Sequence, residues 1–294
     1  MHSESACAVS LPELEQLQTI IERLDEHARV ETLTRVGGYP VQGVVLGTDA
    51  EQAPCLLLVG GVHGLERIGT KVVLAYLATL AERLQWDELT RTALERSRIA
   101  AIPLLNPVGM RANTRANGNG VDLMRNGPVQ GTGGASWFVG GQRLSPLLPW
   151  YMGKTGRLEA EAEALIRFVG QQVATSKASI ALDVHSGFGF QDRLWFPYAH
   201  TRRPFPNTPE VYALCELLNQ TLPHHVYHAE PVSRSYTIQG DLWDFMYDQS
   251  RSQGAGLFIP MTLEMGSWTW VRKNPRQLFS IPGSFNPVKR HRLA

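Results

Sequence analysis

The chain has 294 residues, of which 43% are hydrophobic and 19% are charged, a composition typical of a globular protein with a substantial core. Lys and Arg number 28 against 27 Asp and Glu, so a net charge of +1 gives no reason to expect a nucleic acid or an anionic membrane as partner. Three scattered cysteines, Cys7, Cys55 and Cys215, are too few for a disulfide framework or a thiolate metal site.

The N-terminal residues contain no basic segment followed by an apolar one, as a secretion signal would. No apolar run approaches the roughly 18 residues of a membrane span. We therefore expect a cytoplasmic protein.

Short apolar segments alternate with longer segments of helical periodicity. In chain order we expect strands at 44–46 and 56–62, a helix at 68–84, a strand at 99–105, a helix at 158–173, a strand at 180–184, a helix at 209–222 and a strand at 257–263. This alternation predicts an α/β fold, with a mixed, mostly buried sheet flanked by helices. We expect one domain over residues 1–294, because no linker divides the chain.

Residues 127–156 interrupt this pattern, being rich in Gly, Pro and Trp without a sustained period. The composition predicts a long loop, and loops of this length usually form functional rims or mobile segments. With Trp137, Phe138 and Trp150, the loop either covers an active site or packs as a surface excursion.

The first candidate site follows the apolar strand at 56–62, where His63 and Glu66 stand three residues apart beyond a glycine turn. This spacing lets an imidazole and a carboxylate converge on one ion. So short a pair is a weak signal by itself, and a solvated turn is the alternative.

Two later strands carry further candidates. His185 ends the strand at 180–184, and open α/β sheets bind ligands beyond the carboxyl ends of their strands. Glu264 interrupts an apolar strand, where a buried carboxylate is costly unless it is paired or functional; a water-facing edge position is the alternative. Two histidines and one glutamate are a known zinc ligand set with an open position for water. Glu264 would then be free to take a proton from that water.

Four blocks in order resemble the zinc carboxypeptidases of the funnelin type, which include bacterial murein peptide amidases and related amidohydrolases. They are HGLE at 63–66, RANGNGVDLMRN at 115–126, DVHS at 183–186 and LEM at 263–265, within a region from about Val44 to Gly266. The resemblance implies that His63, Glu66 and His185 bind one Zn²⁺ per chain, and that Glu264 is the general base.

The second block matches residues that support the chemistry in this family. Arg115, with Arg111 as the competing choice, corresponds to the arginine that polarises the scissile carbonyl and stabilises the oxyanion. Asp122 matches the acid that orients the first zinc histidine.

The same resemblance assigns substrate contacts. Arg125 matches the arginine that grips the substrate's terminal carboxylate, and Asn126 beside it belongs to the same group. Tyr236, eight residues before Asp244, has the spacing of the family's substrate-binding tyrosine. Met124 departs from the family, which usually has asparagine there, so an amide donor to the carboxylate is replaced by an apolar group.

These residues predict a zinc-dependent hydrolase that cleaves an amide bond in a small peptide, of the carboxypeptidase or peptide amidase type. One alternative is a deacylase of N-acyl amino acids, similar to desuccinylases and aspartoacylases. Another is a metal-binding module without catalysis, against which an intact Glu264 and Arg115 argue. The sequence does not predict the oligomeric state.

Overall fold

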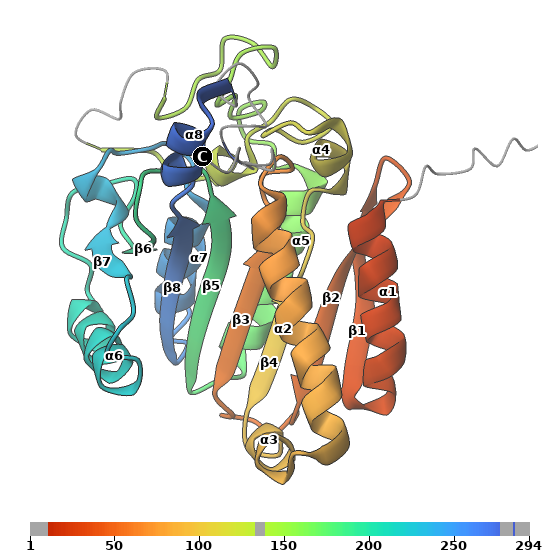
Figure 1. The fold of residues 1–294 in the computed structure, drawn as a ribbon. Coiled ribbons are helices and arrows are strands. Elements are labelled where there is room, and N and C mark those ends of the chain that lie inside the picture. The colour runs from red at the N-terminus through yellow and green to blue at the C-terminus, as the bar shows by residue number, and fades with distance from the viewer. Residues whose placement is uncertain (1–10, 133–138, 277–284, 286–294) are drawn as a thin grey trace, which may run out of the picture.

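The computed structural model describes residues 11–132, 139–276 and 285; Cys7, Trp137 and Phe138 lie outside them. The described residues form one eight-stranded sheet with helices on both faces, which confirms the predicted α/β fold (Figure 1). The strands are β1 (Ala28–Val36), β2 (Tyr39–Gly47), β3 (Cys55–Gly60), β4 (Arg98–Ile102), β5 (Ala178–Ser186), β6 (Arg193–Phe196), β7 (His228–Pro231) and β8 (Leu257–Met265). The helices are α1 (Pro12–Leu24), α2 (Arg67–Trp86), α3 (Glu88–Leu94), α4 (Pro107–Ala112), α5 (Ala160–Ala174), α6 (Thr208–Thr221), α7 (Leu242–Ser252) and α8 (Trp268–Lys273), with short 3-10 turns at Asp25–His27, Leu123–Arg125 and Val232–Arg234.

The sheet is mixed, with strand order β1-β2-β4-β3-β5-β8-β6-β7. The four central strands, β4, β3, β5 and β8, run parallel, whereas β2 and β6 join them antiparallel. Strand β3 is almost continuously apolar because helices cover both faces of the sheet at its centre.

Each face of the sheet has its own layer of helices (Figure 1). Helices α1 and α2 cover one face, where Leu17, Leu74 and Leu77 pack in a buried cluster with strand residues. Helices α5 and α7 cover the other, where Phe168 and Tyr247 belong to a second buried cluster. The sheet therefore carries a core on both sides and leaves its strand ends to form a site.

The carboxyl ends of β3, β5 and β8 lie at the same edge of the sheet, at the top of Figure 1. Helix α2 begins at this edge and packs closely on β5. The backbones are so close that a Cβ added at Gly69 would lie 2.0 Å from the carbonyl oxygen of Val184. Only glycine permits this approach, which places the first turn of α2 beside the end of β5.

The expected strands and helices all overlap observed elements, namely β2, β3, β4, β5 and β8, and α2, α5 and α6. In the described part of residues 127–156, the structure contains no helix or strand beyond an isolated bridge between Gln142 and Tyr151. The side chain of Gln142 bonds to backbone groups of residues 144, 145, 148 and 149, so this part of the loop is internally braced. Among the described residues, no helix is long and apolar enough to cross a bilayer.

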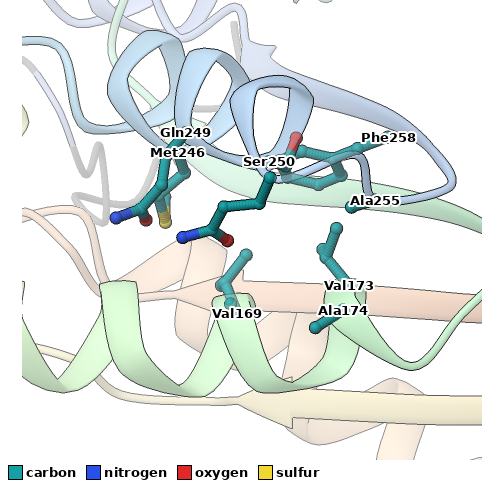
Figure 2. Close-up of a pocket in the computed structure, with 10 residues that line it drawn as sticks. Val169, Val173, Ala174, Met246, Gln249, Ser250, Ala255 and Phe258 are labelled. Carbon is teal, nitrogen blue, oxygen red and sulfur yellow. The ribbon is translucent and has the colours of Figure 1, made fainter.

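A small hollow lies between α5 and α7, and its lining includes the apolar side chains of Val169, Val173, Met246 and Phe258 and the polar ones of Gln249 and Ser250 (Figure 2). Its volume of about 10 Å³ has room for about one water molecule. This hollow is far too small for a substrate.

Candidate active site

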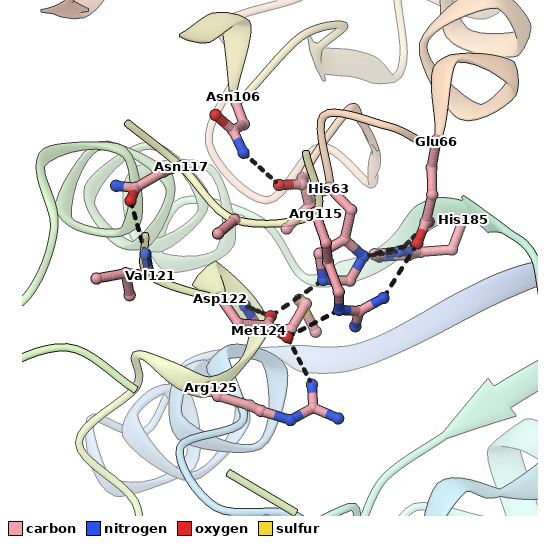
Figure 3. A network of polar contacts seen from close by, with 12 residues as sticks. His63, Glu66, Asn106, Arg115, Asn117, Val121, Asp122, Met124, Arg125 and His185 are labelled. Carbon is pink, nitrogen blue, oxygen red and sulfur yellow. Dashed lines mark hydrogen bonds and ion pairs between the residues drawn. The ribbon is translucent and has the colours of Figure 1, made fainter. Parts of the chain in front are cut away.

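His63, Glu66 and His185 converge at the carboxyl edge of the sheet (Figure 3). The Nδ1 atom of His63 lies 3.0 Å from Glu66 Oε1, and the Nδ1 atom of His185 lies 2.9 Å from Glu66 Oε2. All three side chains are buried, and their potential ligand atoms lie within 4.8 Å of one another. Within the part of the chain that the structure describes, this is the one group of three or more His, Cys, Asp or Glu residues placed to hold a metal ion.

Three different elements supply these side chains. His63 stands in the turn after β3, Glu66 is the residue that precedes α2, and His185 is near the end of β5. The backbone N–H of Ser186 donates to Glu66 Oε2 over 3.1 Å, which ties the end of β5 to the start of α2. The site is therefore fixed by neighbouring parallel strands and the close α2 contact.

The outer nitrogen of each imidazole faces a buried carboxylate. His63 Nε2 lies 3.1 Å from Asp122 Oδ1, as the family resemblance implies, and His185 Nε2 lies 2.7 Å from Asp183 Oδ2. With Nε2–H donating outward, both Nδ1 atoms direct a lone pair inward. The sequence prediction gave Asp183 no role. Residues two apart on a strand share a face, so the Asp-Val-His spacing could have indicated that Asp183 contacts His185.

Charge pairing in the cluster is strong. Burial alone would raise the pKa of Glu66, but His63 and His185 outweigh it and hold that pKa below its usual range. Burial would lower the pKa of His185, but Asp183 and Glu66 raise it well above the ordinary value. The surroundings of His185 thus favour a positive charge at this point.

The donor set fits a zinc ion. The two Nδ1 atoms are 3.1 Å apart and both border the Glu66 carboxylate, so lone pairs of three groups meet in one small volume. Such an arrangement requires a proton or a cation between the groups. Two imidazoles and one carboxylate are a common zinc ligand set.

Glu264 lies on β8 directly beside His185, since the two are Cα partners in the β5–β8 ladder. It is buried, which excludes the water-facing alternative. Burial, followed by the nearby Glu66 carboxylate, raises the pKa of Glu264 to about 8. A carboxyl group so placed can exchange a proton near neutral pH.

The structure separates the two candidate arginines. Arg115 donates from Nε to Asp122 Oδ2 over 2.8 Å, and its Nη1 lies 3.2 Å from Glu66 Oε1. Arg111 instead donates to the Tyr39 hydroxyl over 3.0 Å. Arg115 is therefore the arginine next to the ligand cluster (Figure 3).

Arg125 and Tyr236 lie together close to this cluster. The buried Arg125 donates from Nε to the Val139 carbonyl over 3.1 Å, and its Nη1 lies 3.5 Å from Asp122 Oδ2. Burial raises the pKa of Tyr236, while Arg125, which hydrogen-bonds the Tyr236 side chain, lowers it; Glu264 and Arg115 also influence this pKa. Tyr236 thus lies among the candidate catalytic groups, and its substrate-binding role stays a prediction.

Asn126 and Met124 have structural contacts of their own. Asn126 donates from Nδ2 to the Met152 carbonyl over 3.0 Å and accepts from the Glu159 N–H over 2.7 Å, which holds residues 152–159 in place. Met124 is buried and belongs to the apolar cluster between the sheet and α7. Their substrate contacts therefore remain predictions, and the structure gives both side chains another role.

The fold and the cluster together define an α/β protein with a two-histidine, one-glutamate metal site at the edge of its central parallel strands. The chain belongs to the zinc carboxypeptidase family, Peptidase_M14, whose profile matches residues 14–274. The enzymes of this family use zinc, and His63, Glu66 and His185 form the cluster able to bind it here.

Individual relatives are more distant. Carboxypeptidase SOL1 of Arabidopsis thaliana is 30% identical over 98 residues, which are 32% of this chain and 20% of that protein. Thrombin-activatable fibrinolysis inhibitor shares the fold with a TM-score of 0.68 and 18% identity, over 84% of this chain and 63% of that one. Carboxypeptidase A of Helicoverpa armigera gives a TM-score of 0.66 and 17% identity, over 85% and 62% of the two chains. The chain thus spans a fifth of the curated relative and under two thirds of these two structures.

Proposed function

We propose that this protein is a zinc-dependent hydrolase that cleaves an amide bond next to the free carboxyl end of a peptide. The observation that carries the proposal is the position of Glu264, a buried carboxyl group directly beside the His63–Glu66–His185 cluster. A structural metal site would not require such a group.

The side chains divide the chemistry among them. When bound, zinc lowers the pKa of a water molecule and polarises a carbonyl group. Glu264 takes the proton from the attacking water and passes it to the leaving amine. Arg115, held by Asp122 and Glu66, supplies a fixed positive charge toward the developing oxyanion.

Arg125 is the group suited to the carboxylate end of a substrate. Its guanidinium is buried and has Asp122, the Val139 carbonyl and Tyr236 as partners, so it is held in one orientation before a substrate arrives. A rigid planar fork recognises a carboxylate better than a flexible ammonium group does.

Deacylation of N-acyl amino acids uses the same groups, because its product also carries a free carboxylate for Arg125. The two reactions differ in what lies on the acyl side of the scissile bond. A screen of the zinc-loaded protein against N-blocked dipeptides, longer peptides and small acyl amino acids tests the assignment. Faster turnover of peptides supports the proposal, and faster turnover of small acyl amino acids replaces it with deacylation.

The same screen tests the assignment of Arg125. Arg125→Lys should raise KM for substrates with a free carboxylate by at least tenfold and change KM little for the matching amides. Equal effects on both would remove Arg125 from carboxylate recognition. Metal binding without hydrolysis of any amide would make the protein a metal-binding module.

A further inference from the structure

We propose that Asp183 and Trp243 are positioning residues that hold His185 in the orientation needed for metal binding, so that α7 contributes to metal affinity. The inference rests on the metal site of the proposed function. It adds two residues that act on the metal only through His185.

The three side chains form a buried chain of hydrogen bonds. Asp183 Oδ2 lies 2.7 Å from His185 Nε2 and accepts from the Trp243 indole N–H over 2.8 Å. Asp183 and Trp243 are 0% and 3% exposed, so water does not replace either bond. The other oxygen of the carboxylate, Oδ1, is buried without a hydrogen-bond partner among the described residues.

Among the described residues, the indole and the imidazole are the two donors that stabilise this carboxylate. An ionised carboxylate in the interior is costly when its hydrogen bonds are missing. Removal of the indole N–H would leave the imidazole as the one donor, and the carboxylate would then be free to rotate about its remaining bond. Trp243 therefore fixes the direction of the oxygen that holds His185.

The two histidines of the site are supported differently. Asp122, which faces His63, also contacts Arg115 and Arg125, so much of its charge is offset (Figure 3). In the described part of the chain, Asp183 forms no ion pair with Lys or Arg, and a neutral indole takes that place. Asp183 thus directs more of its negative charge to the His185 ring, which increases the ability of Nδ1 to donate to a cation.

The elements explain how the contact is kept. Asp183 and His185 lie on the same face of β5, two residues apart. Trp243 lies in the first turn of α7, whose start is fixed by Asp241, the side chain of which accepts from the Asp244 N–H over 2.8 Å. The helix start is therefore capped at the turn that carries the indole.

The test measures zinc affinity, by competition with a chelator, for Asp183→Asn, Trp243→Phe and the double variant. Asp183→Asn should weaken zinc binding by 10- to 100-fold, a range found for such supporting carboxylates. Trp243→Phe, which keeps an aromatic ring but no N–H, should weaken it several-fold. The double variant should bind zinc no more weakly than Asp183→Asn alone, because the indole acts through the carboxylate.

Trp86→Phe and Asp49→Asn are matched controls at exposed positions and should leave zinc affinity unchanged. Melting temperatures of the metal-free variants separate positioning from general packing. Lower melting temperatures with unchanged zinc affinity in both single variants would overturn the proposal, as would fully additive losses in the double variant. Trp243→Phe alone decides the case if Asp183→Asn does not fold.

These measurements use no substrate, so they separate the inference from the proposed function. A protein that hydrolyses no amide but loses zinc affinity in the variants would support the inference and refute the function. An active enzyme whose variants bind zinc like the unaltered protein would do the reverse.

Discussion

At the scale of single residues, Glu264 shows how surroundings change the chemistry of an ordinary carboxyl group. Burial and the Glu66 carboxylate raise its pKa from the usual 4.5 to about 8. Between these two pH values, the group keeps its proton in the folded, metal-free protein but loses it in the unfolded chain. The protonated Glu264 therefore contributes fully to the stability of the fold below pH 4.5, and this contribution is lost as the pH rises through 8.

Glu264→Gln removes this titration, since the amide cannot ionise. Without metal, the variant should gain stability relative to the unaltered protein between about pH 5 and pH 8, by on the order of a few kcal/mol. Urea unfolding at several pH values with a chelator present measures the difference. A stability difference that does not change with pH would show that Glu264 titrates normally.

Met124 gives a second prediction, because its buried side chain belongs to the apolar cluster beside α7. The family resemblance implies that Met124→Asn restores a donor for the substrate's carboxylate. The packing predicts instead a loss of about 2 to 4 kcal/mol in the free energy of unfolding, since the change leaves a cavity and buries an amide. Unchanged stability, together with a better ratio of free-carboxylate to blocked substrates, would place residue 124 at the substrate.

Site residues could be predicted from the sequence where a short local pattern identifies them. His63 and Glu66 share one turn, and His185 and Glu264 each stand at the end of an apolar strand, so local pattern and family resemblance identify them. The partnership of Asp183 with Trp243, 60 residues away, depends on how α7 docks on the sheet, which no local pattern reveals.

At the scale of elements, the central strands and long helices followed from apolar periodicity because burial determines their sequences. The prediction did not include β1, a mostly exposed edge strand, or the four-residue strands β6 and β7. It also omitted α1 and α7. Edge strands need no continuous apolar pattern, so the extent of the sheet could not be predicted from such a pattern.

The contact of α2 with β5 makes an element-scale prediction. Gly69→Ala places a Cβ 2.0 Å from the Val184 carbonyl oxygen, so the start of α2 must move away from β5. We expect a loss of about 1 to 3 kcal/mol in stability and a weaker zinc affinity, because Glu66 immediately precedes this helix. Thermal unfolding and chelator competition measure the two effects.

Gly170→Ala in α5 is the matched control, because a Cβ at that position meets nothing within 4 Å. It should leave zinc affinity unchanged and stabilise the protein by about 0.5 to 1 kcal/mol, as expected for alanine in a helix. If Gly69→Ala behaves like this control, the close approach of α2 to β5 does not position the site.

At the scale of the whole molecule, one sheet edge collects side chains from three parallel strands, a helix start and the 115–126 segment. The family profile covers all of these positions, since it extends from residue 14 to residue 274. The family assignment does not identify the substrate, because the loops that line such sites vary most among related folds. The position of Arg125, which suits a carboxylate, therefore says more about the substrate than the overall fold does.

In the proposed function, Glu264 and the zinc cluster together hydrolyse a peptide bond. The most direct measurement compares the zinc content and the release of a terminal amino acid by the unaltered protein and by Glu264→Gln. We predict one zinc ion in both, with turnover in the variant lower by roughly 10² to 10⁴-fold. A Glu264→Gln variant that binds zinc and keeps full turnover would contradict the proposed role of Glu264.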